Sequence, residues 1–219
     1  YLQAIDGMTF GESREQGVTR GRNFYHEPLG IALTAPQGWK IANAPDAITL
    51  VNAAGDAGLV VKTVPPNAGA SHEEIIRNVF KPTEGRTERR TLGGLAATHV
   101  VGTRRNAQGQ TGGFQATIVS GPAQRHYALL YAARDGLALQ RAATQLREAE
   151  ASFRPLSAAD RQAARPWVLK TVAFPPGGFA ELARRSPLPT RAEQQLRLIN
   201  GVYGAQREPR AGEPVKIVE

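Results

Sequence analysis

The chain has 219 residues, of which 41% are hydrophobic and 21% charged, with a formal net charge of +8 and no cysteine. This composition supplies material for a core and excludes wholesale disorder, and the lack of thiols excludes disulfides, thiolate metal sites and cysteine nucleophiles. No apolar stretch reaches the ~18–20 residues of a membrane-spanning helix. The chain opens at Tyr1 without a signal peptide, so we expect a processed or truncated piece of a longer protein.

The first 28 residues are polar and rich in glycine. They predict a connecting arm over 1–28, with one short pairing segment at 22–25.

A strand-rich pattern begins at Leu29 and continues for about a hundred residues. Apolar residues alternate with polar ones, and glycine- or proline-containing turns separate the runs, which is typical of consecutive antiparallel strands. The predicted strands are 29–35, 39–42, 48–52, 59–64, 88–92, 96–105, 113–119 and 125–133.

Two helices interrupt and close this series. Ser71 and Glu74 have the spacing of a capping box, which predicts a helix that Pro82 ends. Residues 137–149 carry an apolar stripe at helical spacing. The segment 29–156 is therefore predicted to be an α+β domain, an antiparallel sheet with flanking helices.

Residues 157–165 are charged and lack large apolar side chains, so they predict a linker to a second domain over 166–219. This domain is predicted to have the order β-α-α-β, with strands at 167–172 and 215–218. Its first helix covers 179–185. Thr190 and Glu193 predict a capping box for the second helix, and Asn200-Gly201 predict its end.

No catalytic or metal motif is found. A zinc-protease helix needs two histidines four positions apart, and none of the four histidines has such a partner. His99 is expected to be a packed sheet residue. The sequence also lacks a nucleophile-elbow serine and a phosphate-binding loop, and Asp46 and Asp56 are expected to form turns. The residues predict a binding protein without a cofactor or metal of its own.

The residues around the start of the chain resemble the segment that follows the catalytic domain of bacterial HtpX/BepA-like zinc-dependent metallopeptidases. This resemblance implies a non-catalytic, periplasmic or envelope region, with zinc expected only in an upstream protease domain that precedes Tyr1. The matching positions are Tyr1, Leu2, Ala4, Ile5, Asp6, Gly7, Gln16, Gly17, Arg20, Gly21, Arg22, Phe24 and His26.

The middle and the tail resemble two further families. Residues 29–156 are similar in pattern to PsbP-like domains, through Pro36, Gly38 and Trp39 and the late helix ending near Ser152-Phe153, which implies α-β-α layers and an interaction module.

The tail is similar to LysM domains, which bind N-acetylglucosamine polymers such as peptidoglycan. This resemblance implies glycan-binding positions at Pro176, Gly177, Asn200 and Gly201. LysM repeats carry Asp-Thr where this chain has Gly178-Phe179, which changes one wall of the sugar groove.

Three functions remain open. The first is an accessory region of an envelope zinc protease that positions a substrate or an envelope protein partner. The second is a stand-alone envelope protein whose tail binds cell-wall glycan. The third, nucleic-acid binding, follows from the net charge, but the arginines are scattered and no recognition motif accompanies them, so it is disfavoured.

Overall fold

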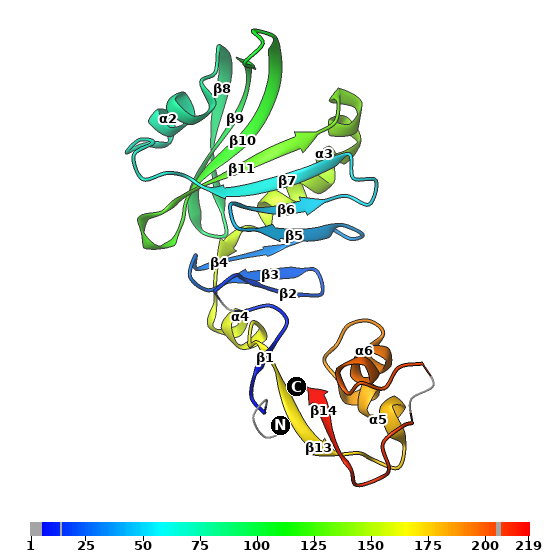
Figure 1. Ribbon diagram of the computed structural model, residues 1–219. Helices are drawn as coiled ribbons and strands as arrows, with labels where there is room; N and C mark the ends of the chain where they lie inside the picture. Colours follow the sequence, from blue (N-terminus) through cyan, green and yellow to red (C-terminus); the bar gives the residue numbers. More distant parts are fainter. Residues whose placement is uncertain (1–5, 14, 205–206) are drawn as a thin grey trace. The chain divides into compact units, whose positions relative to one another are not determined.

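The computed structural model describes residues 6–13, 15–204 and 207–219 (Figure 1). The family resemblance at Tyr1, Leu2, Ala4 and Ile5 lies outside these residues. The described chain divides into two compact units, a larger one within 15–164 and a smaller one that combines 6–13 with the residues from Arg165 onward.

The larger unit contains a seven-stranded antiparallel sheet with the order β5-β6-β7-β11-β10-β9-β8. Short turns connect most neighbours, which is why consecutive strands pair. This confirms the predicted α+β class with an antiparallel sheet. The strands are β5 (Lys40–Ala44), β6 (Ala47–Val51), β7 (Ala57–Thr63), β8 (Glu84–Leu92), β9 (Leu95–Arg105), β10 (Thr111–Ser120) and β11 (His126–Ala133).

Helices cover both faces of this sheet, because successive residues of a strand point to opposite sides. On β10, Val119 packs in the core with α3 (Gly136–Ala151), whereas Ile118 packs with α2 (His72–Ile75) and the π-helix η1 (Ile76–Phe80). The predicted α-β-α layering is present. The Ser71 cap of α2 is also confirmed, since its hydroxyl accepts a hydrogen bond from the Glu74 amide at 3.2 Å.

A second sheet in the larger unit has the order β12-β4-β3-β2. Its strands share the core with α3 and Tyr127, so the predicted strand at 29–35 belongs to this sheet and not to the larger one. A short 3-10 turn, η2 (Pro122–Gln124), precedes β11. The strands are β2 (Val18–Arg20), β3 (Asn23–His26), β4 (Ile31–Thr34) and β12 (Arg154–Pro155).

The structure differs from the predicted arm and linker. The segment β1 (Thr9–Phe10) pairs with β13 of the small unit, while β2 and β3 lie in the larger unit. Residues 157–165 contain a helix, α4 (Ala158–Ala163). Its stability comes from hydrogen bonds, which hydrophobic patterning does not reveal: Ser157 and Asp160 form a capping box, and Asp160 is paired with Arg154.

The small unit has the predicted β-α-α-β order: β13 (Trp167–Ala173), α5 (Gly178–Arg185), α6 (Ala192–Ile199) and β14 (Pro214–Val218). Phe174, Phe179 and Leu196 form its core with Val215. The predicted capping box of α6 was wrong: the helix begins after Arg191, which has φ 48°, and no side chain caps it. Glu193 instead forms an ion pair with Arg197, one turn later in the helix, at 3.1 Å.

Candidate functional site: an arginine-lined groove

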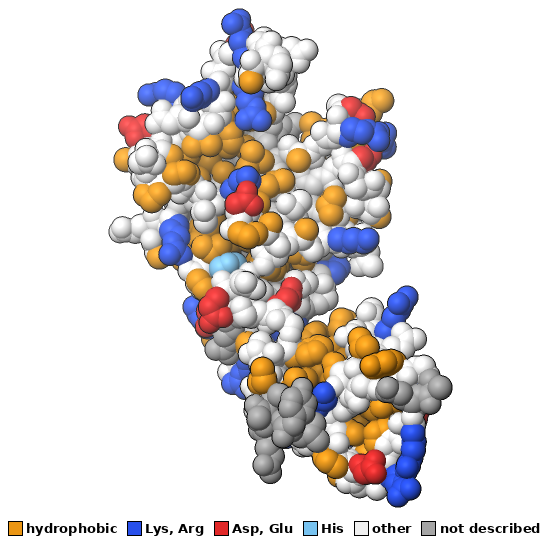
Figure 2. Space-filling model, viewed as in Figure 1, with side chains coloured by type: hydrophobic (Ala, Val, Ile, Leu, Met, Phe, Trp, Pro, Cys, Tyr) orange, Lys and Arg blue, Asp and Glu red, His pale blue; other side chains and the backbone are white. Residues whose placement is uncertain are grey.

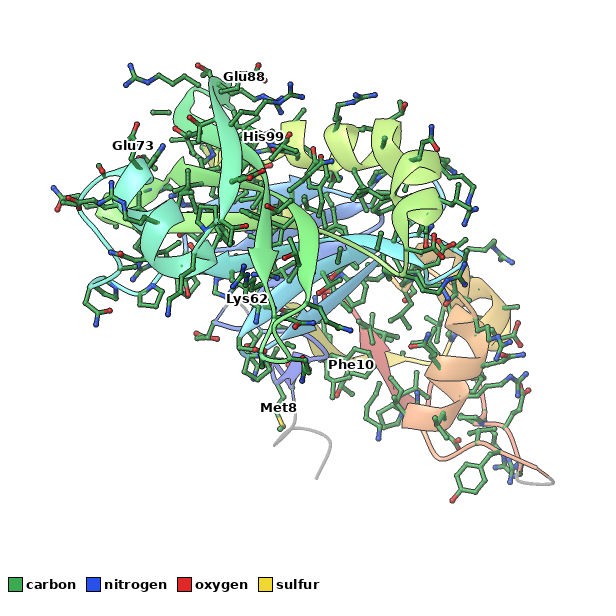
Figure 3. The ribbon with its side chains drawn as sticks, turned by 90° about the horizontal axis from the view of Figure 1, so that it is seen from above. Met8, Phe10, Lys62, Glu73, Glu88 and His99 are labelled. Carbon is green, nitrogen blue, oxygen red and sulfur yellow. The ribbon has the colours of Figure 1, made fainter. Side chains whose placement is uncertain are left out.

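A groove of about 720 Å³ lies on one face of the seven-stranded sheet. The helix α3 packs on this face against β7 and β11, and Leu92, Ala97 and Val119 of β8, β9 and β10 belong to the same core. The groove lies over other residues of these three strands. In Figure 3, the labelled side chains of Glu88 and His99 lie on the side of the sheet that carries α3. The groove is therefore bounded by the edge strand β8, the sheet surface and the exposed flank of α3.

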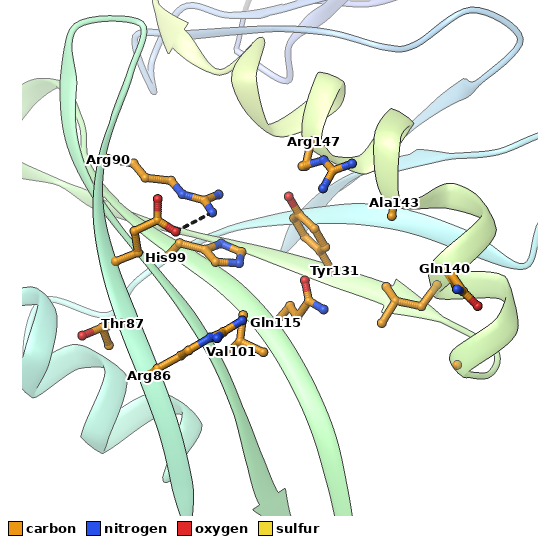
Figure 4. Close-up of a pocket in the computed structure, with 13 residues that line it drawn as sticks. Arg86, Thr87, Arg90, His99, Val101, Gln115, Tyr131, Gln140, Ala143 and Arg147 are labelled. Carbon is orange, nitrogen blue, oxygen red and sulfur yellow. Dashed lines mark hydrogen bonds and ion pairs between the residues drawn. The ribbon is translucent and has the colours of Figure 1, made fainter.

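Strand register places the floor residues side by side. Arg86 pairs with Val101, Val101 with Gln115, and Glu88 with His99. Tyr131 of β11 continues the floor toward α3 (Figure 4). The walls are Arg86, Glu88 and Arg90 on β8 and Leu139, Gln140, Ala143 and Arg147 on α3.

A buried carboxylate, Glu150 at the end of α3, anchors the inner end of the groove. It accepts hydrogen bonds from the Tyr131 hydroxyl at 2.9 Å and from Arg90 at 3.2 Å, and a further one from the Thr117 hydroxyl. The Nδ1 atom of His99 lies 3.4 Å from the same carboxylate and 2.7 Å from the Thr117 hydroxyl oxygen. His99 is a packed sheet residue, as predicted, and its ring also lines the groove.

These contacts and burial shift the pKa values of Glu150 and Tyr131. Burial alone would raise the pKa of Glu150, but the hydrogen bonds from His99, Thr117 and Tyr131 outweigh burial and hold the pKa below its ordinary value. Burial and the nearby Glu150 charge raise the pKa of Tyr131. The carboxylate is thus ionised and fully engaged, and the phenol remains a donor.

The cations of the groove are not all paired. Arg90 is held between Glu88, at 2.9 Å, and Glu150. Within the described residues, no carboxylate oxygen lies within 4 Å of the guanidinium of Arg86 or Arg147. Figure 4 shows Arg86 extending from β8 and Arg147 from α3, with Gln115 and Tyr131 between them. Two guanidinium groups on opposite walls suit an anion, since each can donate two parallel hydrogen bonds to a carboxylate or phosphate.

A second polar cluster joins His72 to the strands beside it. Its Nδ1 lies 2.8 Å from the Thr98 hydroxyl oxygen and its Nε2 lies 2.8 Å from that of Ser120, while the His126 ring stands edge-on at 5.6 Å. A histidine that deprotonates a serine needs its cationic form stabilised, usually by a carboxylate. Here the third partner is a neutral hydroxyl, and burial lowers the pKa of His72. The arrangement ties α2 to the sheet.

The positions predicted to bind glycan stand at two places in the small unit. Pro176 and Gly177 precede α5 and are exposed, and Asn200 and Gly201 follow α6. Asn200 donates to the carbonyl oxygens of Leu196 and Lys216 at 2.8 Å and accepts from the Lys216 amide at 2.7 Å. Its side chain therefore joins α6 to β14. Glycan binding at these positions stays a prediction.

In the part of the chain that the structure describes, no group of three or more His, Asp or Glu side chains is arranged to hold a metal ion. The same residues include no helix of the length and apolarity needed to cross a bilayer.

Comparison with known proteins gives similarity in structure only. No protein-family model and no curated protein matches the chain. Among solved structures, cyanobacterial PsbP (CyanoP) from Synechocystis sp. PCC 6803 is 12% identical with a TM-score of 0.41, over 67% of this chain and 98% of that one. LpqN, described as involved in cell envelope biogenesis of Mycobacterium tuberculosis, is 13% identical with a TM-score of 0.39, over 57% of this chain and 82% of that one.

A PsbP protein is thus one of the similar structures, as the sequence resemblance implied. Similarity at this level carries no inference about ligand or function. The resemblances to zinc metallopeptidases and to LysM domains stay predictions.

Sequence reasoning did not find the groove. Its charged residues come from two segments far apart in the chain, β8 and α3, so no local sequence pattern joins them. One signal was available. Glu150 follows the predicted helix directly, four positions after Leu146 of its apolar stripe, and a carboxylate at a core position requires buried donors.

Proposed function

We propose that this chain is a non-catalytic binding protein of the cell envelope whose groove holds a carboxylate-bearing ligand. The observation that carries the proposal is the pair of guanidinium groups of Arg86 and Arg147, which face the groove from opposite walls without a carboxylate partner among the described residues. The groove volume falls within the range of about 300–1,000 Å³ that is typical of ligand sites.

The floor supports ligand binding in preference to catalysis. Its titratable groups, His99, Glu150 and Tyr131, bond to one another and to Thr117. A general base must have a lone pair directed at the substrate, whereas the Glu150 carboxylate already accepts from Tyr131, Arg90 and Thr117, and the Nδ1 atom of His99 faces Thr117. Gln115 and Gln140 add neutral donors and acceptors that can orient a polar ligand.

The test is a calorimetric titration of the full chain with citrate and with a triglutamate peptide. We expect saturable binding that weakens as salt is raised, because the recognised charges are partly exposed. The double variant Arg86→Ala/Arg147→Ala should lose at least about ten-fold in affinity, since a charge-assisted hydrogen bond contributes about 1.5–3 kcal/mol.

The matched control is Arg105→Ala/Arg184→Ala, which removes the same charge outside the groove and should bind as the wild type does. Equal binding by the groove variant and the control variant would show that the groove is not the site.

The role of this binding in the cell is proposed from the sequence. As an accessory region of an envelope zinc protease, the groove would hold an acidic segment of a substrate or partner protein. The reading frame upstream of Tyr1 tests this role: a His-Glu-x-x-His motif is expected there, and a reading frame without one removes the role.

Glycan binding by the small unit is the second candidate, and it rests on Pro176 and the residues around it. Nucleic-acid binding has less support. On the face shown in Figure 2, Lys and Arg side chains are dispersed among other side chains and form no continuous patch.

A further inference from the structure

The edge of the seven-stranded sheet that borders the groove is open. The strand β8 stands last in the sheet order, and among the described residues it pairs only with β9. It is nine residues long, contains no proline, and is exposed over almost its whole length. An edge strand of this kind presents unpaired amides and carbonyls that can accept another strand.

The direction of the free backbone groups follows from the hairpin. Gly93 and Gly94, with φ of 54° and 83°, form a two-residue turn, and in such hairpins the flanking residues Leu92 and Leu95 form a hydrogen-bonded pair. Alternation along an antiparallel pair then turns the amides of Thr87 and Arg89 away from β9. These are the groups that an added strand would meet.

The opposite edge of the sheet differs. The strand β5 has five residues, and its Asn43 side chain already donates to the backbone carbonyl of Gln16. The edge at β8 is longer and, within the described chain, carries no such contact.

The exposed arginines beside β8 favour an acidic strand as the added segment. Arg86 points to the groove, whereas Arg89 points to the other face with a side chain that is 90% exposed. Glu73 is the acidic group beside Arg89, at 4.0 Å, too far for a strong ion pair. On the groove face of β8, Glu84 and Glu88 alternate with Arg86 and Arg90, but Glu88 is already paired with Arg90. A strand placed along β8 would meet Arg86 on its groove face and Arg89 on the other.

We propose that β8 receives an extended acidic segment of a partner protein as an eighth strand of the sheet. Backbone hydrogen bonds to β8 hold the segment, and carboxylates on its groove side reach Arg86, which projects from the same edge strand. This inference rests on the proposed function, because it names the form of the carboxylate-bearing ligand.

The experiment uses a fluorescein-labelled decapeptide of alternating glutamate and valine, with binding to the full chain followed by fluorescence anisotropy. A second peptide has the same sequence with N-methyl groups on four consecutive central residues, which keeps every charge but blocks both edges of the strand. We expect the methylated peptide to bind at least about ten-fold more weakly. Backbone amides of Thr87 and Arg89 should exchange with solvent more slowly when the unmodified peptide is bound.

Two protein variants separate the backbone from the side chain. Thr87→Pro removes an outward amide, which an edge strand tolerates, and should lose the same affinity as methylation of the peptide. Thr87→Ala keeps the amide and should bind as the wild type does. If Thr87→Pro is misfolded by circular dichroism, the methylated peptide and the exchange rates decide.

The outcomes distinguish the two proposals. Equal binding of both peptides, or citrate binding without peptide binding, overturns strand addition and leaves the proposed function standing. If citrate, triglutamate and the two decapeptides all fail to bind, strand addition and the proposed function are both overturned. Weaker binding of the methylated peptide together with protected β8 amides supports strand addition.

Discussion

The Tyr131 hydroxyl on β11 donates a hydrogen bond of 2.9 Å to the carboxylate of Glu150 at the end of α3. Arg90 of the edge strand donates to the same carboxylate at 3.2 Å. One buried acid therefore joins the helix, the floor and the edge strand that together form the groove. The shape of the groove depends on this junction.

Replacing Glu150 with alanine should destabilise the larger unit by about 3–5 kcal/mol, because the Thr117 hydroxyl, the Tyr131 hydroxyl and Arg90 each lose an acceptor in a buried site. Urea unfolding followed by Trp39 fluorescence in a Trp167→Phe background measures the change. The control is Glu148→Ala on the exposed side of the same helix, expected to lie within about 0.5 kcal/mol of the wild type. Similar losses in the two variants would contradict the role given to Glu150.

The stability of the larger unit should depend on Asp160 in acid. Hydrogen bonds from Arg154 and Ser157 hold the pKa of Asp160 well below its ordinary value of about 3.9. The unfolded chain therefore binds this proton first, so the stabilisation is complete above about pH 4 and is lost as the pH falls further. Comparison of wild type with Asp160→Asn by urea unfolding should show a difference that is constant near pH 7 and shrinks below about pH 4. A difference that does not vary with pH would be inconsistent with this ion pair.

Asn200→Ala should destabilise the small unit by about 2–3 kcal/mol, since it leaves the Lys216 amide and two carbonyl oxygens without their partner. Trp167 fluorescence in a Trp39→Phe background reports this unfolding. Gln194→Ala, on the exposed side of the same helix, should have little effect.

The same result bears on glycan binding. Loss of retention on peptidoglycan sacculi by Asn200→Ala would follow from unfolding, whereas the exposed Pro176 can be changed to alanine with the fold intact. Pro176→Ala is therefore the variant that tests the predicted glycan site.

The two glycines of the β8–β9 turn should differ when each is changed to alanine. Both have positive φ, which costs an alanine about 1–2 kcal/mol. A methyl group on Gly93 would also lie 2.5 Å from Cβ of Arg154 and 2.8 Å from the Phe153 carbonyl oxygen, whereas one on Gly94 meets nothing within 4 Å. We expect Gly93→Ala to be more destabilising by a further ~1–3 kcal/mol in thermal unfolding. Equal losses would mean that the turn shifts without strain.

Much of the secondary structure could be predicted because it depends on local patterns. Turn signals and apolar patterning gave β7, β9, β10 and β11 to within two residues at each end, and the apolar stripe gave α3. The predicted strand 88–92 is only the second half of β8, whose first half, from Glu84, is polar and exposed. Where local signals were weak, prediction failed. The helix α4 has no large apolar residue. Polar contacts among Ser157, Asp160 and Arg154 stabilise it, and a search for apolar periodicity does not detect such contacts. Thr190 and Glu193 had the spacing of a cap, but the chain turns at Arg191 instead.

The sequence by itself determined the antiparallel α+β organisation, the β-α-α-β order of the tail and the lack of a zinc-protease helix motif, because periodicity and motif spacing are written in neighbouring residues. Only the tertiary structure decided that β1 pairs with β13, that Asn200 joins α6 to β14, and that Arg86 and Arg147 face one groove. Each of these relationships joins segments that lie apart in the chain, and strand register and helix placement, which arise from packing of the whole core, bring them together.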